Sequence, residues 1–137
     1  LECGYETLHS TRLTRLSLAG SVTGVFLGFG GSDFGQLLAA TPAGSSVYAS
    51  TGSAPSIASG RLSYVLGLHG PCASFDTACS SALTAYHTGL HALQLAECAA
   101  AVAAGVNLML LPGAGTLWAI AGLTSSLGRS FTFDGLP

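Results

Sequence analysis

The stretch Phe75-Asp76-Thr77-Ala78-Cys79-Ser80-Ser81-Ala82-Leu83 decides the fold and holds the residue with the clearest chemistry. An extended segment leads into a polar pair, then into a thiol among small side chains, and then into an amphipathic helix. We expect a sharp turn that places Cys79 at the start of this helix, where unpaired N–H groups and the helix dipole favour a thiolate. Those N–H groups, that of Cys79 included, can also hold a developing oxyanion. The stretch therefore predicts that Cys79 is a nucleophile that the turn exposes to a substrate.

Strand and helix patterns alternate on either side of this stretch. Strands are predicted at 22–27, at 72–75 and within 99–111, where Val106, Leu108 and Leu110 lie near the centre. Helices are predicted at 1–8, 33–38, 53–66, 80–95 and 118–123, with loops at 9–21 and 41–51. Alternating apolar strands and helices predict a layered α/β fold.

The helix boundaries have recognisable signals. Asp33 and Gln36 resemble a capping box. Ser53 is expected to cap a helix that has Pro55 in its first turn and ends at Gly67. Asp76 and Thr77 are candidate catalytic residues by position, but their side-chain acceptors favour capping of the 80–95 helix. Ser80 and Ser81 are expected to supply small size and local hydrogen bonds. The apolar stripe of this helix is expected to face the core; it consists of Leu83, Tyr86, Leu90 and Leu93.

Three histidines lie near Cys79 in the sequence, and a Cys–His pair is a recurrent catalytic unit. His87 and His91 would lie roughly 12 and 18 Å along the helix axis from the thiol, too far to contact it. His69 lies in the preceding turn and is close enough in sequence to approach. The His87–His91 spacing suits a metal, but Thr88 stands where a zincin motif requires glutamate, so no metal site is expected.

The remaining candidate residues favour structural roles. The glycine-rich stretch 28–33 misses the dinucleotide fingerprint, because Asp33 occupies the last glycine position. Arg61 is interpreted as a structural donor rather than a substrate ligand. The other cysteines have no zinc or disulfide spacing and are expected to be small buried hydrophobes; they are Cys3, Cys72 and Cys98. This cysteine usage predicts a reduced, cytoplasmic protein.

The composition is unusual for an independent domain. The chain has 137 residues, of which 7% are charged and 49% hydrophobic, and the net charge is −2. Ordinary domains have about 25% charged residues, so we expect some faces to be covered by further chain or by a partner subunit. The absence of a basic cluster excludes nucleic-acid binding. The longest apolar run, 98–111, is too short for a transmembrane helix.

The segment Asp76-Thr77-Ala78-Cys79-Ser80-Ser81 resembles the active-site signature of the β-ketoacyl synthases, and most closely that of type I or modular polyketide synthase ketosynthase domains. Five further regions resemble the same family in the same order: 51–64, 67–71, 97–110, 128–129 and 132–134. Phe131 departs from the pattern, since the family usually has lysine there, and residues 135–137 also diverge.

This resemblance implies a thiolase-like α-β-α-β-α layered fold, with residues 1–137 a partial ketosynthase domain from its N-terminal half. It implies that Cys79 accepts an acyl chain from the phosphopantetheine of acyl carrier protein. A malonyl-type extender then decarboxylates and condenses with that chain, in polyketide or fatty-acid biosynthesis. No metal or redox cofactor is implied, and the parent protein is expected to be a homodimer. The two catalytic histidines of the family lie beyond Pro137, so the chain alone is expected to be inactive.

A different class of protein also fits the resemblance. A non-catalytic homologue would bind acyl chains or carrier protein and serve as a scaffold. Homologues of that kind usually lack the cysteine, so the presence of Cys79 favours the enzyme.

Overall fold

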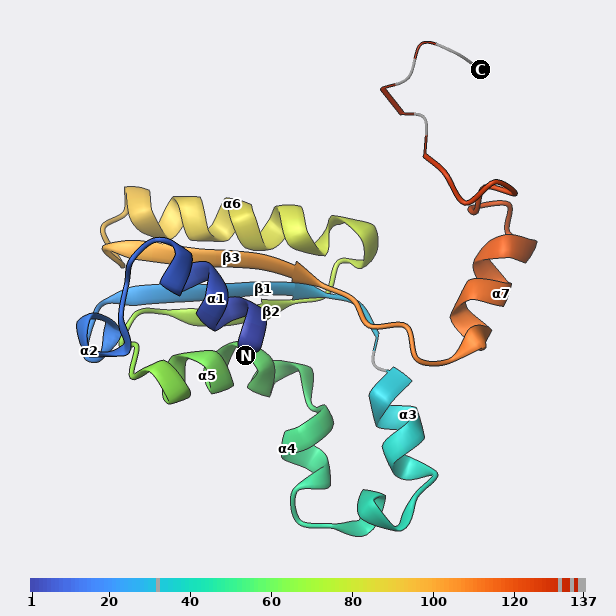
Figure 1. Ribbon diagram of the computed structural model, residues 1–137, viewed down its shortest axis with the longest axis horizontal. Coiled ribbons are helices and arrows are strands. Elements are labelled where there is room, and N and C mark those ends of the chain that lie inside the picture. The colour runs from blue at the N-terminus through green and yellow to red at the C-terminus, as the bar shows by residue number, and fades with distance from the viewer. Residues whose placement is uncertain (32, 131, 134, 136–137) are drawn as a thin grey trace.

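The frame of the molecule is a three-stranded parallel sheet with strand order β2-β1-β3 (Figure 1). The computed structural model describes residues 1–31, 33–130, 132, 133 and 135. The strands are β1 (Thr23–Phe29), β2 (Cys72–Phe75) and β3 (Ala100–Val106). β1 is central because its nearly continuous apolar run can be buried on both faces. The sequence features at Phe131, Asp134 and 136–137 lie outside the described residues.

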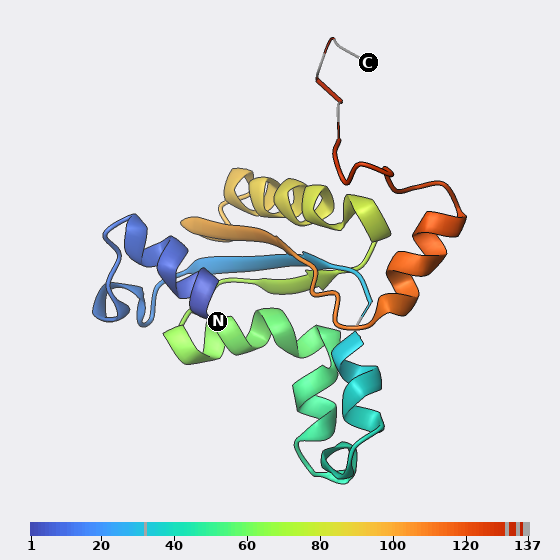
Figure 2. The ribbon, with the colours of Figure 1, turned by 45° about the vertical axis from the view of Figure 1, so that its right-hand side comes forward.

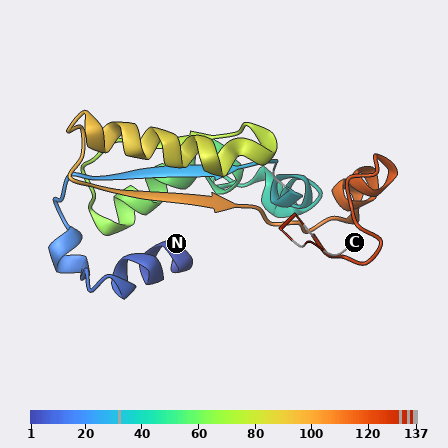
Figure 3. The ribbon, with the colours of Figure 1, turned by 90° about the horizontal axis from the view of Figure 1, so that it is seen from above.

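Helices cover both faces of this sheet, as the views in Figures 1 and 3 show. One face carries α6 (Ser81–Gln94), and the other carries α1 (Glu2–Ser10), α2 (Arg15–Leu18) and α5 (Pro55–Leu66). Side chains of β1 alternate between the two layers: Phe26 packs with Ala85 of α6, whereas Val25 packs with Leu62 of α5. The predicted α/β layering is therefore confirmed.

Two segments leave the sheet where the parallel strands end (Figure 2). The connection from β1 to α5 contains α3 (Asp33–Ala39), the 3-10 turn η1 (Pro42–Ser45) and α4 (Ala49–Ser53). The segment after β3 leads into α7 (Pro112–Ile120). The expected loops at 9–21 and 41–51 thus contain short helices. Both departures lie at the carboxyl edge of the sheet, next to the start of α6.

The boundaries of α5 test the capping predictions. Pro55 is its first residue, and Gly67 ends it in the left-handed conformation at φ 66°, both as predicted. The cap predicted at Ser53 is wrong, because Ser53 ends α4 and its hydroxyl donates to the Ala49 carbonyl at 2.8 Å. The capping-box prediction for Asp33 also needs correction: Asp33 is the first residue of α3, and its carboxylate bonds elsewhere.

The prediction for the buried face of α6 is wrong. The large apolar side chains of its stripe are 39% to 70% exposed. The side chains that face the sheet are instead small, and Ala85 and Ala92 are 0% and 3% exposed. A Cβ on Gly89 would already lie 3.0 Å from the Phe26 ring, so only small residues permit this close approach.

Further expectations are settled by exposure and element bounds. Cys98 is buried as predicted, but Cys3 and Cys72 are exposed, because they lie on the outer surface of α1 and at the start of an edge strand. β3 ends at Val106, so Leu108 and Leu110 follow the strand instead of lying within it.

None of the helices in the described part of the chain is long and apolar enough to cross a bilayer.

Candidate active site

Cys79 lies in a tight 3-10 turn, η2 (Ala78–Ser80), that joins β2 to α6. Ala78 has a φ of 56°, in the left-handed region that residues with a Cβ seldom adopt. The Asp76 carboxylate accepts a hydrogen bond from the Ala78 N–H at 3.2 Å, which supports this conformation. The turn therefore reverses the chain sharply, as predicted, and leaves Cys79 exposed.

Small hydroxyl side chains hold the turn in place. Ser81 is only 4% exposed, and its Oγ accepts from the Thr77 N–H at 2.8 Å and donates to the Ala78 carbonyl at 2.7 Å. The Ser80 hydroxyl donates to the Thr77 carbonyl at 2.8 Å. The local hydrogen bonds predicted for both serines are confirmed. The predicted caps of the 80–95 helix are wrong, because the N-cap of α6 is Ser80 and no side chain of the described residues bonds to it as a cap. Asp76 instead accepts from the Ala78 N–H within η2, and the Thr77 hydroxyl contacts the hydroxyls of Ser80 and Thr84.

Two glycines let the start of α6 lie directly against the sheet. A Cβ on Gly28 of β1 would come within 2.3 Å of the Ser81 carbonyl group. A Cβ on Gly105 of β3 would come within 2.7 Å of the Ala82 side chain. Since real Cβ atoms essentially never come within 3.0 Å of such atoms, these glycines fix the depth at which α6 begins. They thereby fix the position of Cys79, two residues before Ser81.

The backbone N–H of Cys79 has no hydrogen-bond partner among the described residues. N–H groups in the first turn of a helix have no intrahelical acceptor and are available to other groups. The thiol and this donor belong to the same exposed residue. The arrangement can therefore present a nucleophile and a donor for an oxyanion together.

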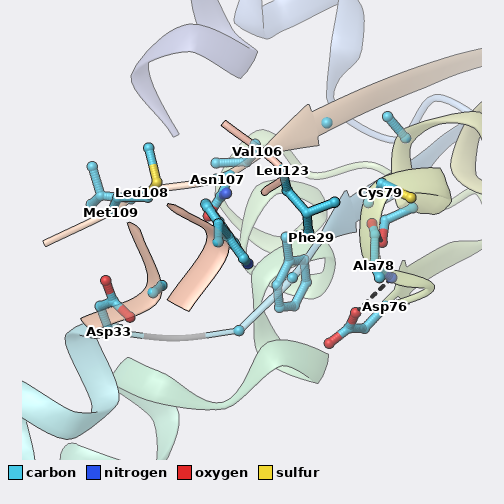
Figure 4. Close-up of a pocket in the computed structure, with 18 of the residues that line it drawn as sticks. Phe29, Asp33, Asp76, Ala78, Cys79, Val106, Asn107, Leu108, Met109 and Leu123 are labelled. Carbon is cyan, nitrogen blue, oxygen red and sulfur yellow. Dashed lines mark hydrogen bonds between the residues drawn. The ribbon is translucent and has the colours of Figure 1, made fainter. Parts of the chain in front are cut away.

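Cys79 lines a cavity of about 850 Å³ at the carboxyl ends of β1 and β3 (Figure 4). Ligands bind at this edge in open sheets of parallel strands, and the volume suits a small molecule or a chain segment. Most of the surrounding side chains are apolar or small. They include Phe29, Ala82, Val106, Leu108, Met109, Trp118 and Leu123. The cavity can therefore surround an apolar group next to the thiol.

The far side of the cavity is organised by Asp33. Its Oδ2 accepts hydrogen bonds from the N–H groups of Leu110 and Leu111, each at 3.0 Å. The bonds join the start of α3 to the segment before α7. Leu110 and Leu111 follow Asp33 by 77 and 78 residues in the chain. The expected capping role of Asp33 is thus replaced by a long-range contact at the cavity.

The histidines lie away from the thiol. His69 precedes β2 and Cys79 follows it, so the two residues lie at opposite ends of a strand about 13 Å long. His87 and His91 are exposed on α6, with their rings 6.0 Å apart. Within the described ranges, no histidine lines the cavity and no three potential ligands gather into a metal site.

Arg61 has the structural role expected of it. Its Nη2 donates to the Thr51 carbonyl at 2.8 Å, which ties α5 to α4. Arg61 is not among the residues that line the cavity.

Comparison with known proteins agrees with this geometry. The family model described as beta-ketoacyl synthase, N-terminal domain, matches residues 1–135. The chain is 44% identical over 134 residues to erythronolide synthase EryA3 of Saccharopolyspora erythraea, covering 98% of this chain and 4% of that protein. It is 44% identical over 114 residues to the spectinabilin polyketide synthase system protein NorC of Streptomyces orinoci, covering 83% of this chain and 5% of that protein.

A solved ketosynthase structure also matches the fold of this chain. The chain superposes on the ketosynthase from module 6 of the bacillaene synthase of Bacillus subtilis 168 with a TM-score of 0.78 and 31% identity. The match covers 92% of this chain and 20% of that structure. The chain belongs to the β-ketoacyl synthase family and has the thiolase-like α/β fold of the ketosynthases. It spans a small part of the length of these relatives.

Sequence reasoning missed two features of the site. The first is the pair of glycines at 28 and 105, although a glycine inside a strand is a known signal of close backbone approach. The second is the contact of Asp33 with residues 110 and 111, which no local pattern could indicate because it joins distant parts of the chain.

Proposed function

We propose that this chain is the nucleophile-bearing part of a ketosynthase that extends polyketide chains by decarboxylative Claisen condensation. The observation that carries the proposal is the exposed Cys79 on a tight turn, at the start of α6 and against an apolar cavity. A thiol in that position can attack a thioester whose acyl chain lies in the cavity.

The proposed reaction has two steps. The Cys79 thiolate attacks the carbonyl carbon of an acyl thioester on acyl carrier protein. A bond forms from the carbonyl carbon to Sγ, the bond from that carbon to the phosphopantetheine sulfur breaks, and this sulfur leaves as a thiolate. A malonyl-type extender on a carrier protein then loses CO2, and its enolate carbon attacks the Cys79 thioester. The new carbon–carbon bond replaces the bond to Sγ, so the thiolate is regenerated. The N–H of Cys79 is one candidate donor to the oxyanion in both steps.

The proposal assigns the remaining groups to residues outside this chain. By resemblance to the family, two catalytic histidines would follow the part of the ketosynthase that this chain represents. A second oxyanion donor would come from the same later part. The 137-residue chain alone is therefore expected to have no condensing activity. The steps need no metal or redox cofactor. We further propose that the parent protein is a cytoplasmic homodimer that receives its substrates from acyl carrier protein.

Thiol labelling and substitution test the proposal in the full-length protein that contains this chain. Limiting iodoacetamide followed by peptide mapping should label Cys79 before Cys72, which is also an exposed free thiol and serves as the internal control. Cys79→Ala should abolish condensation, whereas Cys72→Ala should retain it. Retention of condensation by Cys79→Ala would overturn the proposal.

A further inference from the structure

We infer that Asp33 is a positioning residue that holds the cavity wall remote from Cys79 and so sets which acyl chain lengths Cys79 accepts. This inference rests on the proposed condensation and adds a determinant of specificity to it. The carboxylate of Asp33 accepts two backbone N–H groups, from Leu110 and Leu111, through the same oxygen. Bonds from N–H groups to an ionised acceptor are stronger than neutral ones.

The segment that Asp33 holds has little other support. Residues 107–110 lie between β3 and α7 and have no regular secondary structure. In the part of the chain that the structure describes, the two bonds to Asp33 are the only hydrogen bonds that reach residues 108–111. Leu108 and Met109 line the cavity directly before the tethered pair. The position of this apolar wall therefore depends on one carboxylate.

The same tether reaches α7. Leu111 is the N-cap residue of α7, and Pro112 is its first residue. Trp118 of α7 and Leu123 just after it also line the cavity. Fixing the Leu111 N–H thus places the start of a helix that contributes a second apolar surface.

The wall and the nucleophile are held by separate contacts. Figure 4 shows Asp33, Leu108 and Met109 on one side of the cavity, with Phe29 between them and the side that carries Asp76, Ala78 and Cys79. The bonds that hold η2 come from Asp76 and Ser81, not from Asp33. Loss of the Asp33 carboxylate should therefore leave the thiol in place and loosen only the distant wall. A short acyl group would not reach that wall, whereas a longer chain would.

The test compares acylation of Cys79 by acetyl and octanoyl thioesters of N-acetylcysteamine in the full-length protein. In Asp33→Ala, we expect the KM for the octanoyl thioester to rise about tenfold, with the acetyl reaction within about twofold of wild type. Asp33→Asn, which keeps one acceptor oxygen, should recover part of the octanoyl reaction. Gln36→Ala is the matched control, because Gln36 is exposed on the same helix and does not line the cavity.

Hydrogen exchange tests the tether without any chemistry. The peptide that contains Leu110 and Leu111 should exchange faster in Asp33→Ala than in wild type, while the peptide that contains Cys79 should be unchanged. Equal loss of both acylations, no loss of either, or unchanged exchange at 110 and 111 would overturn the inference. Failure of the wild type to acylate Cys79 would instead overturn the proposed function, and the exchange result would still report on the tether.

Discussion

Gly28 of β1 and Ser81 of α6 lie in backbone contact, so that a Cβ on Gly28 would come within 2.3 Å of the Ser81 carbonyl group. The start of α6 therefore rests directly on the end of the central strand. Because Cys79 precedes Ser81 by two residues in the same turn, this contact determines how far the thiol stands from the sheet.

Gly28→Ala should push α6 away from β1 and displace the thiol. We expect the free energy of unfolding to fall by about 1–3 kcal/mol, as for other overpacked sites, and alkylation of Cys79 to change in rate. Urea denaturation and timed iodoacetamide labelling measure the two effects. Gly60→Ala is the control, since a Cβ there meets nothing within 4 Å and alanine favours the α5 helix. Equal stability of the two variants would contradict the contact.

Ser81→Ala removes the one buried hydroxyl that bonds to both sides of the turn. The Thr77 N–H and the Ala78 carbonyl would each lose that partner, which should cost about 1–3 kcal/mol in the free energy of unfolding. Ser80→Ala removes an exposed hydroxyl and should cost less. The comparison is made by urea denaturation, and a larger effect of Ser80→Ala would show that the turn is held in another way.

The two faces of α6 should differ in how strongly substitution lowers the free energy of unfolding. Ala85→Leu adds volume at a position that is 0% exposed against Phe26, and we expect it to lower the free energy of unfolding by about 1–3 kcal/mol. Leu83→Ser alters a side chain that is 70% exposed and should stay within about 0.5 kcal/mol of the parent chain. Urea denaturation of the 137-residue chain, at concentrations low enough that it is monomeric, checks both. A larger cost for Leu83→Ser than for Ala85→Leu would show that the large apolar stripe of α6 faces the core, as periodicity predicts.

The isolated 137-residue chain should self-associate. Its α6 face leaves Leu83, Tyr86, Leu90 and Leu93 at 39% to 70% exposure, and apolar patches of this kind promote association. Light scattering after size exclusion should show species larger than a monomer. The double variant Leu83→Ser with Leu90→Ser should shift the distribution toward the monomer. A parent chain that scatters as a monomer would contradict the expectation.

Local signals in the sequence predicted the elements well. Pro55 and Gly67 act within their own helix ends, so the bounds of α5 follow from nearest neighbours alone. The strand at 72–75 and the long helix after Cys79 are also confirmed. The polar pair and the small residues of 76–81 correctly indicated a sharp turn, because their hydrogen bonds stay within that turn.

The face of α6 could not be predicted in the same way. Its sequence has a stripe of large apolar residues and a stripe of small ones, and periodicity favours the large one. The small stripe faces the sheet because the Phe26 ring of β1 projects toward α6. Gly89 and Ala85 leave room for this ring, so the helix can lie close to the sheet. The tether from Asp33 to residues 110 and 111 was equally hidden, since it depends on two strand ends that meet only after folding.

The most direct test of the account is to find where an acyl group binds covalently. The full-length protein is incubated with an acyl thioester, digested and mapped by mass spectrometry. The account predicts the acyl mass on the peptide that contains Cys79, with none on the exposed thiols Cys3 and Cys72 and none at this position in Cys79→Ala. Condensation that proceeds while Cys79 remains unmodified, or an acyl group found on a different residue, would contradict it.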